Sequence, residues 1–406
     1  MEEHIITTVK NKNIVMIVFS HYESDSRVKR EAQSLSQNGY NIMCISLGEK
    51  KEKKIKIYDS NITVIKKMHW LHRFKKGSFI RYLIGCTLFF FVSFIEMLKI
   101  HSKHKINLIH IHNPPDHLTF IALPFKLLYN SKIILDRHEP FAIHFISKIG
   151  FSLKSVLFSF LLAYEKLSYL FIDAIITIND IERLDVKRIA SRKKIVIIKN
   201  SLDITLFQKS NVNNLSNENR DEYIILYQGI ISLKRDIDTL IYAVKKIITE
   251  IPDLKCYIIG NGDYLDEAIN LTEKLSLEKT FIFSKKWLKQ CELIKLMAKA
   301  DIFLLTLKDI PVYHRAAPNK LFEYMYLNKP IIAANLPIIR KLTENTCYYY
   351  QSENPNDLGE KILMLRKNPD LFCSEKGNYN EILKNNAWEI EEKKLLLLYQ
   401  ELEKKH

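Results

Sequence analysis

Ala316-Ala-Pro-Asn-Lys-Leu-Phe-Glu-Tyr-Met-Tyr-Leu-Asn-Lys-Pro-Ile-Ile-Ala-Ala334 is the stretch that says most about the fold of this 406-residue chain. Pro318 and Asn319 suit the start of a helix, because proline fits the first turn and asparagine can cap free amides. Asn328 and Pro330 suit its end, and the apolar run that follows predicts a buried strand. The stretch therefore predicts a loop, a helix and a strand of an α/β fold.

Two charged side chains lie near the start of this predicted helix. Lys320 and Glu323 are three residues apart, so both project near the same end. A helix N-terminus offers free amides and a partial positive charge that suit phosphate, and a lysine beside it adds positive charge. A carboxylate one turn further on can bind vicinal hydroxyls. The segment can thus hold a ribose diphosphate, although an ordinary helix with surface charges explains the same residues.

The alternation of strands and helices continues in both directions from this stretch. In the first half we expect strands over residues 13–20, 40–46, 62–65, 108–111, 132–135, 174–178 and 194–198. In the second half we expect strands over residues 223–227, 255–259, 280–283, 302–305 and 331–334. The polar, aperiodic residues 209–220 predict a linker between the halves. The pattern is typical of two parallel sheets, each covered by helices, with ligands held in a cleft.

Composition limits the classes of function. Lys and Arg number 61 against 46 Asp and Glu, a formal charge of +15 that indicates an acidic partner such as nucleic acid, anionic lipid or a phosphorylated substrate. The basic residues are spread along the chain without base-stacking motifs, so we do not expect nucleic acid. The six cysteines have neither zinc-site nor disulfide spacing, and no export signal begins the chain. We therefore expect a cytoplasmic protein.

One apolar segment bears on membrane contact. Residues 79–100 predict a helix, but the uncharged part, 82–95, is shorter than the ~20 residues that a membrane span needs. A buried or interfacial helix is the better interpretation. The basic, aromatic residues 66–76 that precede it can rest on anionic headgroups, or form a solvated loop. We expect peripheral contact with an anionic inner membrane.

The second half carries two glycine turns that follow strands. Gly229 follows the predicted strand 223–227, and Arg235 lies just before a helix, at the sheet edge where ligands bind. A positive charge at a helix start is disfavoured unless an anion is bound there, which favours an anion-binding role for Arg235. Asp236 and Asp238 form a D-x-D string, which we interpret as a helix cap and not as a metal site. Gly262 follows the next strand and is weaker evidence for nucleotide binding.

The first half carries polar clusters at the ends of neighbouring strands. His112 and Asp116 follow one strand, and His138 and Glu139 follow the next, so the carboxyl edge of the sheet gathers them. Their spacing fits no compact metal site, and ordinary loop histidines are the alternative. Arg27 lies near a helix N-terminus after the first strand, where it can bind an acceptor phosphate or belong to a plain amphipathic helix.

These segments resemble the sequence motifs of the GT-B glycosyltransferases of family 4, also called glycosyl transferases group 1. The segments that carry the resemblance are Asp25-Ser-Arg-Val-Lys-Arg-Glu-Ala32, His110-Ile-His-Asn-Pro-Pro115, Asp136-Arg-His-Glu139 and Pro318-Asn-Lys-Leu-Phe-Glu-Tyr-Met325. They occur in the family's order over nearly the whole chain. The chain departs from the family at Arg315, where a glutamate is usual, and at Asp236 and Asn328, where glycine is usual.

The resemblance implies a domain plan and a set of site residues. It implies an acceptor domain over residues 1–205, a donor domain over 206–387, and a helix within 388–406 that returns to the first domain. The residues implied in catalysis are His138 for the transferring sugar, Arg235 and Lys320 for the diphosphate, and Glu323 for the ribose. The implied donor-binding residues are Gly229, Arg235, Gly262, Pro318, Asn319, Lys320, Leu321 and Glu323, and the implied acceptor-binding residues are Arg27, His112, Asp116 and Glu139.

The resemblance also implies a reaction. It implies transfer of a sugar from a nucleotide diphosphate sugar with retention of configuration and without a bound metal or other cofactor. The acceptor we expect is a lipid-linked glycan in bacterial surface polysaccharide synthesis, such as lipopolysaccharide or capsule. A nucleotide-sugar epimerase of the same architecture is an alternative. A sugar- or anion-binding protein that has lost catalysis is another, suggested by Arg315.

Overall fold

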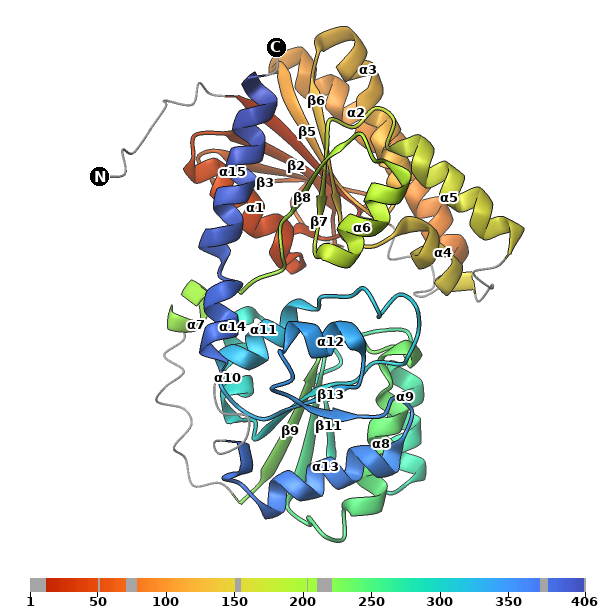
Figure 1. The fold of residues 1–406 in the computed structure, drawn as a ribbon, viewed down its shortest axis with the longest axis vertical. Helices are drawn as coiled ribbons and strands as arrows, with labels where there is room; N and C mark the ends of the chain where they lie inside the picture. The colour runs from red at the N-terminus through yellow and green to blue at the C-terminus, as the bar shows by residue number, and fades with distance from the viewer. Residues whose placement is uncertain are drawn as a thin grey trace. The chain divides into compact units, whose positions relative to one another are not determined.

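The chain folds into two compact units, each built around a sheet that is covered by helices (Figure 1). Unit 1 comprises Met1–Lys199 with Glu389–His406, and unit 2 comprises Asn200–Trp388. The structure, a computed structural model, describes residues 12–49, 52–70, 79–149, 155–202, 204–209, 221–372 and 379–404. The C-terminal helix thus belongs to unit 1, the unit that contains the N-terminal half of the chain.

The sheet of unit 1 has its described strands in the order β3-β4-β2-β1-β5-β6-β7-β8. These strands pair in parallel, except that β3 is antiparallel to β4. The central strands are runs of Ile, Val and Leu, as expected for strands buried on both faces. The strands are β1 (Asn13–Val18), β2 (Asn41–Leu47), β3 (Ile55–Asp59), β4 (Ile62–Lys67), β5 (Ile106–His112), β6 (Lys132–Arg137), β7 (Ala174–Thr177) and β8 (Lys194–Ile197).

Helices cover both faces of this sheet. Phe89 and Phe125 pack from one side into a core with Ile109, whereas His110, the next residue of β5, turns to the other side and meets Tyr399. The described helices are α1 (Ser26–Gln37), α2 (Phe79–Lys103), α3 (Thr119–Tyr129), α4 (Phe141–Ile149), α5 (Val156–Ser168), α6 (Asp180–Ile189) and α15 (Trp388–Lys404), with the 3-10 helices η1 (Tyr22–Ser24) and η3 (Asp116–Leu118). Helices α2 and α15 therefore lie on opposite faces.

The sheet of unit 2 has its described strands in the order β11-β10-β9-β12-β13-β14, and their pairings are parallel. The strands are β9 (Tyr223–Gln228), β10 (Leu254–Ile259), β11 (Phe281–Phe283), β12 (Ile302–Leu305), β13 (Ile331–Ala334) and β14 (Tyr348–Tyr350). The described helices are α7 (Ile204–Lys209), η5 (Leu233–Arg235), α8 (Ile237–Ile247), α9 (Leu265–Lys274), α10 (Gln290–Lys299), α11 (Asn319–Tyr326), α12 (Pro337–Leu342), α13 (Pro355–Lys367) and α14 (Asn380–Asn385).

Helix α11 is fixed against the middle of this sheet by one tyrosine. The ring of Tyr324 stacks on Phe303 of β12, with centroids 4.4 Å apart and planes 2° from parallel. Its hydroxyl accepts a hydrogen bond from the backbone amide of Gln228, at 3.0 Å. These contacts place the N-terminus of α11 beside the carboxyl end of β9.

The turns after β9 and β10 approach each other closely. The amide of Gly229 donates to the carbonyl of Ile259 at 2.9 Å, and that of Ile231 donates to the carbonyl of Asn261 at 3.1 Å. A Cβ built on Gly262 would come 1.9 Å from the carbonyl oxygen of Ile231. Glycine is therefore required at this position for backbone packing, whatever it does for a ligand.

The predicted α/β fold is confirmed, and the decisive stretch folds as expected. Helix α11 covers Asn319–Tyr326, Asn328 takes the left-handed conformation with φ 50°, and β13 follows. The cap differs in one detail: Pro318 is the N-cap residue and Asn319 the first helical residue, without a side-chain cap. Strands β3 and β14 were not predicted. The linker residues 210–220 lie outside the described residues. So do residues 71–76, which make up most of the basic segment 66–76.

The described part of the basic segment has a different role from the one expected. Lys66 is 2% exposed and forms ion pairs with Glu23 and Glu52. Lys67 pairs with Glu96 of α2 at 2.8 Å. The expectation that these two lysines rest on lipid headgroups is therefore wrong, because both charges are already paired within unit 1.

Substitution of Gly262 tests the close approach of the two turns. Gly262→Ala should lower the free energy of unfolding by about 1–3 kcal/mol, because the new methyl group collides with a carbonyl that is itself hydrogen-bonded. The neighbouring exposed Asp263→Ala is the control and should change it by less than about 0.5 kcal/mol. Chemical denaturation measures both. Equal free energies of unfolding for Gly262→Ala and Asp263→Ala would show that the two turns can move apart without loss of stability.

Candidate functional site

The carboxyl end of β9 and the N-terminus of α11 bring together the residues expected to bind a diphosphate. The Nζ of Lys320 donates a hydrogen bond to the carbonyl oxygen of Gln228 at 2.8 Å and lies 4.0 Å from the centroid of the Tyr227 ring. A Cβ on Gly229 would lie 3.2 Å from this Nζ. The ammonium group therefore sits directly on the glycine turn, next to the first amides of α11.

Arg235 adds a second positive charge to this cluster. Its guanidinium carbon lies 4.8 Å from the centroid of the Tyr313 ring. Burial, followed by the charge of Arg235, holds the pKa of Lys320 well below its usual value, while Glu323 acts in the opposite direction. Within the part of the chain that the structure describes, neither cation forms an ion pair with a carboxylate. Two cations and a helix N-terminus thus converge where an anion would relieve their repulsion.

Glu323 lies one turn into α11, on the same side as Lys320. One of its carboxylate oxygens accepts a hydrogen bond from the side-chain amide of Gln228. The carboxylate is half-buried and points to the carboxyl end of β9. A carboxylate held in this way can accept hydrogen bonds from a pair of vicinal hydroxyls.

The other expected donor contacts have mainly backbone roles. Pro318 is the N-cap of α11, and Asn319 follows it. Leu321 is fully buried, and its amide donates to the carbonyl of Pro318 at 3.1 Å, so its side chain is packed in the core and does not face a ligand. The Cα of Gly262 abuts the carbonyl of Ile231. We therefore assign Leu321 and Gly262 to building the site.

Asp236 takes the place of the family's usual glycine and adopts its conformation, with φ 57°. It stands at the N-cap position of α8, but its carboxylate does not cap that helix. The carboxylate accepts hydrogen bonds from the hydroxyls of Thr239 and Tyr350, at 2.7 and 2.8 Å, and from the amide of Glu353 at 3.1 Å. These bonds tie the turn that carries Arg235 to the end of β14.

In unit 1 the carboxyl ends of β5 and β6 gather a second polar cluster around Asp136. The Nε2 of His138 lies 2.8 Å from an oxygen of Asp136, and Nδ1 of His112 lies 3.2 Å from the same oxygen. Burial alone lowers the pKa of His138, but the charge and hydrogen bond of Asp136 outweigh it and raise that pKa above its usual value. His138 keeps about a fifth of its side chain exposed, so it is the member of the cluster that a ligand can reach.

Arg27 does not fit the acceptor-binding role that we expected of it. It is 2% exposed, and its guanidinium donates to both oxygens of Asp136, at 2.7 and 2.9 Å, and to the carbonyl of Ile198 at 3.0 Å. Such a bidentate pair commits the guanidinium of Arg27 to contacts inside the protein. We therefore assign Arg27 to holding Asp136, which in turn orients His138.

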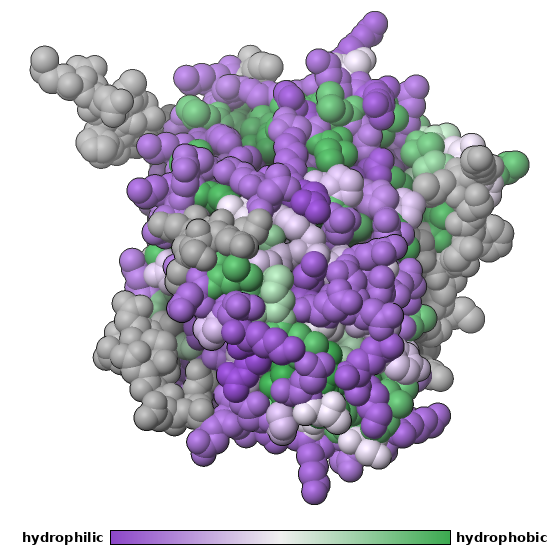
Figure 2. Space-filling model, turned by 60° about the horizontal axis from the view of Figure 1, so that its bottom comes forward, coloured by the Kyte–Doolittle hydropathy of each residue, from purple (hydrophilic) through white to green (hydrophobic). Residues whose placement is uncertain are grey.

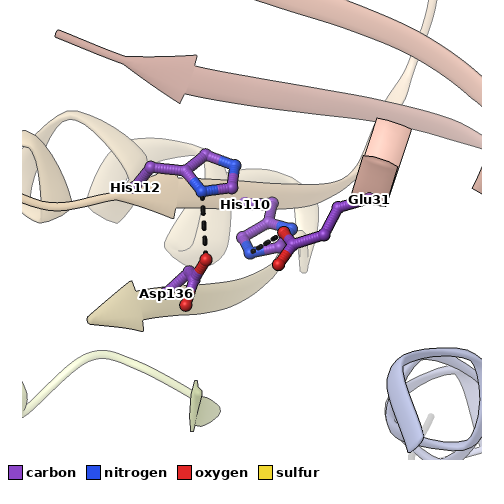
Figure 3. A group of neighbouring side chains, drawn as sticks. All are labelled: Glu31, His110, His112 and Asp136. Carbon is purple, nitrogen blue, oxygen red and sulfur yellow. Dashed lines mark hydrogen bonds and ion pairs between the residues drawn. The ribbon is translucent and has the colours of Figure 1, made fainter. Parts of the chain in front are cut away.

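Behind this pair lies a stack of buried histidines (Figure 3). The rings of His110 and His112 stack with centroids 4.4 Å apart. Nδ1 of His110 lies 2.7 Å from the hydroxyl of Tyr399, and its Nε2 faces a carboxylate oxygen of Glu31 at 3.7 Å. Burial, with the nearby charge of Asp136, raises the pKa of Glu31 to about 8.

Glu31, His110, His112 and Asp136 could each offer a metal-ligand atom, and these atoms lie within 4.8 Å of one another. The donor set nevertheless suits an internal cation better. The guanidinium of Arg27 already engages both oxygens of Asp136 and lies 3.2 Å from Glu31. A metal ion would have to displace it. That the protein works without a metal stays a prediction.

The remaining expected acceptor residues have unequal access. Asp116 is fully buried and accepts from the side-chain amide of Asn113 at 2.8 Å; burial, then the charge of Glu165, raises its pKa to about 8. His112 is also buried. Glu139 keeps 43% of its side chain exposed and is bonded to His144. Of these residues, Glu139 is the one that a ligand can contact directly.

Comparisons with known proteins agree with this division of the chain. The family model for Glycosyltransferase Family 4 matches residues 26–206, and the model for Glycosyl transferases group 1 matches residues 208–388. The chain is a family 4-like GT-B glycosyltransferase. The family recognised from the sequence motifs is thereby confirmed.

Individual relatives of this glycosyltransferase are distant. An uncharacterized glycosyltransferase of Methanocaldococcus jannaschii is 27% identical over 200 residues, which span 47% of this chain and 54% of that protein. Sucrose-phosphate synthase of Thermosynechococcus elongatus superposes with a TM-score of 0.76 at 16% identity, covering 97% of this chain and 99% of that one. HepE of Anabaena, solved with UDP and glucose, gives 0.62 at 13%, covering 97% and 99%. At these identities the likeness establishes the fold.

Several residues of the two clusters were missed from the sequence. Tyr227, Gln228 and Tyr313 contact the expected donor residues, and Asp136 is the hub of the cluster in unit 1. Asp136 lies inside the Asp136-Arg-His-Glu139 motif, which could have drawn attention to it. Tyr313 carries no such signal, because its role depends on the folding of a loop.

Removal of the guanidinium of Arg27 tests its structural role. Arg27→Met should cost about 3–5 kcal/mol in the free energy of unfolding, because Asp136 is left buried without its cation. Arg183→Met is a matched control: Arg183 pairs with Asp180 on the surface, so its loss should cost about 0–1 kcal/mol. Denaturant titration compares them.

A second substitution makes this test specific. Arg27→Met combined with Asp136→Asn should recover part of the lost stability, because the unpaired buried charge is then removed as well. If Arg27→Met alone lowered the free energy of unfolding by less than about 1 kcal/mol, the structural role would be refuted and Arg27 would again be a candidate for binding a ligand.

Proposed function

We propose that this protein transfers a sugar from a nucleotide diphosphate sugar to an acceptor hydroxyl, with retention of configuration. The observation that carries the proposal is the pair of cations, Lys320 and Arg235, that lies beside the N-terminus of α11 without a carboxylate ion-pair partner among the described residues. A diphosphate supplies the missing negative charge. As the bond to the sugar breaks, further charge develops on that diphosphate, and the two cations and the helix amides stabilise it.

The other candidate residues take separate roles in the reaction. Glu323 accepts hydrogen bonds from the ribose hydroxyls, with its carboxylate oriented by Gln228. His138 contacts the transferring sugar through its imidazole, whose pKa is raised by Asp136. Glu139 is the exposed carboxylate that can meet the acceptor. No metal ion or other cofactor has a step in this scheme.

A uridine nucleotide is the first donor to test. The similar fold of HepE was solved with UDP and glucose, and that complex motivates the choice. The acceptor we propose is a lipid-linked glycan of bacterial surface polysaccharide synthesis, such as lipopolysaccharide or capsule. The protein would then act in the cytoplasm, at the inner face of the membrane.

A thermal-shift panel of UDP-, GDP-, ADP- and dTDP-sugars tests the donor site. One nucleotide class should raise the Tm, because a ligand that binds only the folded state stabilises it. The shift should be lost in Glu323→Ala and weakened in Glu323→Gln. It should persist in Glu360→Ala, which removes an exposed carboxylate from another helix of unit 2. Absence of a shift with every nucleotide sugar would refute the donor assignment.

Product analysis then separates the alternatives. A transferase releases the free nucleoside diphosphate when the acceptor is supplied, whereas an epimerase returns a nucleotide sugar with altered configuration. A protein without catalysis, the alternative suggested by Arg315, would bind the donor and change nothing.

The lowered pKa of Lys320 predicts a proton uptake on binding. In the free protein, burial and Arg235 lower this pKa, and a bound diphosphate should raise it. Binding should therefore take up a proton at pH values above the free and below the bound pKa, and none below the free value. Calorimetric titration of the selected nucleotide sugar in buffers of different ionisation enthalpy measures the uptake.

Two lysine substitutions complete this measurement. Lys320→Met should abolish the uptake and weaken binding by about tenfold or more. The exposed Lys274→Met should leave both unchanged. Proton uptake that persists in Lys320→Met would show that another group titrates.

A further inference from the structure

Helix α2 packs one face on the sheet of unit 1 and leaves an apolar stripe in solvent. Cys86, Phe89 and Met97 are buried on the inner side. The outer side exposes Ile84, Leu88, Phe91, Ile95 and Leu98, which follow one another at intervals of three or four residues. The stripe therefore runs straight along the helix for about 21 Å. Phe91, near its middle, is 56% exposed.

Helix α5 repeats this pattern. Val156 and Phe160 are 88% and 67% exposed, and Leu167 continues the same side. Both helices border the start of α3, because His117 of η3 lies 3.1 Å from the carbonyl of Cys86 on α2 and the ring of Phe120 contacts Tyr164 of α5. Both helices thus pack beside the same part of unit 1, and their two exposed apolar stripes are together called the α2–α5 face.

Such a surface is unusual for a protein in water. Monomeric soluble proteins seldom expose contiguous apolar patches of this kind unless something covers them. The face of the protein drawn in Figure 2 is mostly hydrophilic, with its hydrophobic residues in small groups. Helix α2 is long and apolar enough over Tyr82–Lys103 to cross a membrane, by length and composition only. A third of that apolar stretch is buried in the fold.

The charges in the sequence before α2 and α5 indicate what covers the two helices. The sequence contains neither Asp nor Glu from Ser60 to Ile95, and neither from Pro140 to Tyr164. Arg73, Lys75 and Lys76 precede α2, and Lys148 and Lys154 precede α5. The first acidic residue along α2 is Glu96, which turns inward and pairs with Lys67 and Lys99. Each apolar helix is thus preceded by basic sequence without carboxylates.

We propose that the α2–α5 face docks this glycosyltransferase onto an anionic lipid bilayer, with the two apolar stripes in the interface. Exposed apolar side chains and flanking cations are the combination that interfacial helices use. A second copy of the chain fits less well, because an isologous contact would bring together two chains that each carry a formal charge of +15. The proposal rests on the proposed function for its purpose, since a lipid-linked acceptor resides in such a bilayer.

The test is co-sedimentation of the full-length protein with vesicles, which needs no sugar. Vesicles of phosphatidylcholine and phosphatidylglycerol should bind it, and vesicles of phosphatidylcholine alone should bind it more weakly. Ile95→Asp with Leu98→Asp should weaken binding by about tenfold or more. Phe160→Asp should weaken it independently through α5.

The matched control is Ile390→Asp with Leu397→Asp. It changes the same residue types to the same charge, at 43% and 58% exposed positions of α15, which covers the opposite face of the sheet. This variant should bind vesicles as the unchanged protein does. Circular dichroism melting shows which variants are folded.

Three results would overturn the docking surface. One is failure of the unchanged protein to bind anionic vesicles. Another is equal binding by the α2 and α15 variants. The third is a dimer, seen by sedimentation equilibrium, that the α2 variant dissociates. The thermal shift with a nucleotide sugar, measured on the same samples, keeps the two proposals apart: a retained shift without vesicle binding refutes only the docking surface.

Discussion

The pairing of buried charge is the constraint on which both clusters depend. In unit 1 the protein supplies carboxylates for its buried cations: Arg27 pairs with Asp136, and Lys66 pairs with Glu23 and Glu52. In unit 2 Lys320 is held against a carbonyl and an aromatic ring, with the like charge of Arg235 nearby. Desolvating a cation without an ionic partner is unfavourable, and the cost falls when an anion arrives. We propose that this difference between the units separates groups that build the fold from groups that bind a ligand.

The buried pair in unit 1 explains how one histidine becomes available. Asp136 is fixed from behind by Arg27, so its remaining hydrogen-bonding capacity is aimed at His112 and His138. His138 alone of the three lies partly in solvent. Its raised pKa follows from a carboxylate that cannot turn away. The stacked histidine behind it reaches α15, so the C-terminal helix supports the same edge of the sheet.

The sequence predicted the fold well where its pattern repeats locally. Apolar runs bounded by turn residues located the central strands, and Asn328 showed its left-handed turn through its residue type. Strand β3 was missed because most of its side chains are exposed, so it lacks the apolar run of a buried strand. In the site, motif order brought out Lys320, Arg235 and His138. It could not show that Arg27 faces inward to Asp136, 109 positions away, because that contact exists only in the folded sheet.

The binding of a diphosphate by Lys320 and Arg235 is best tested by a crystal structure of the protein with the nucleoside diphosphate selected by the thermal-shift panel. We expect the diphosphate within hydrogen-bonding distance of Lys320 and Arg235 at the N-terminus of α11, with the ribose hydroxyls on Glu323. A nucleotide bound elsewhere, or bound here with its phosphates away from both cations, would refute the proposed donor site.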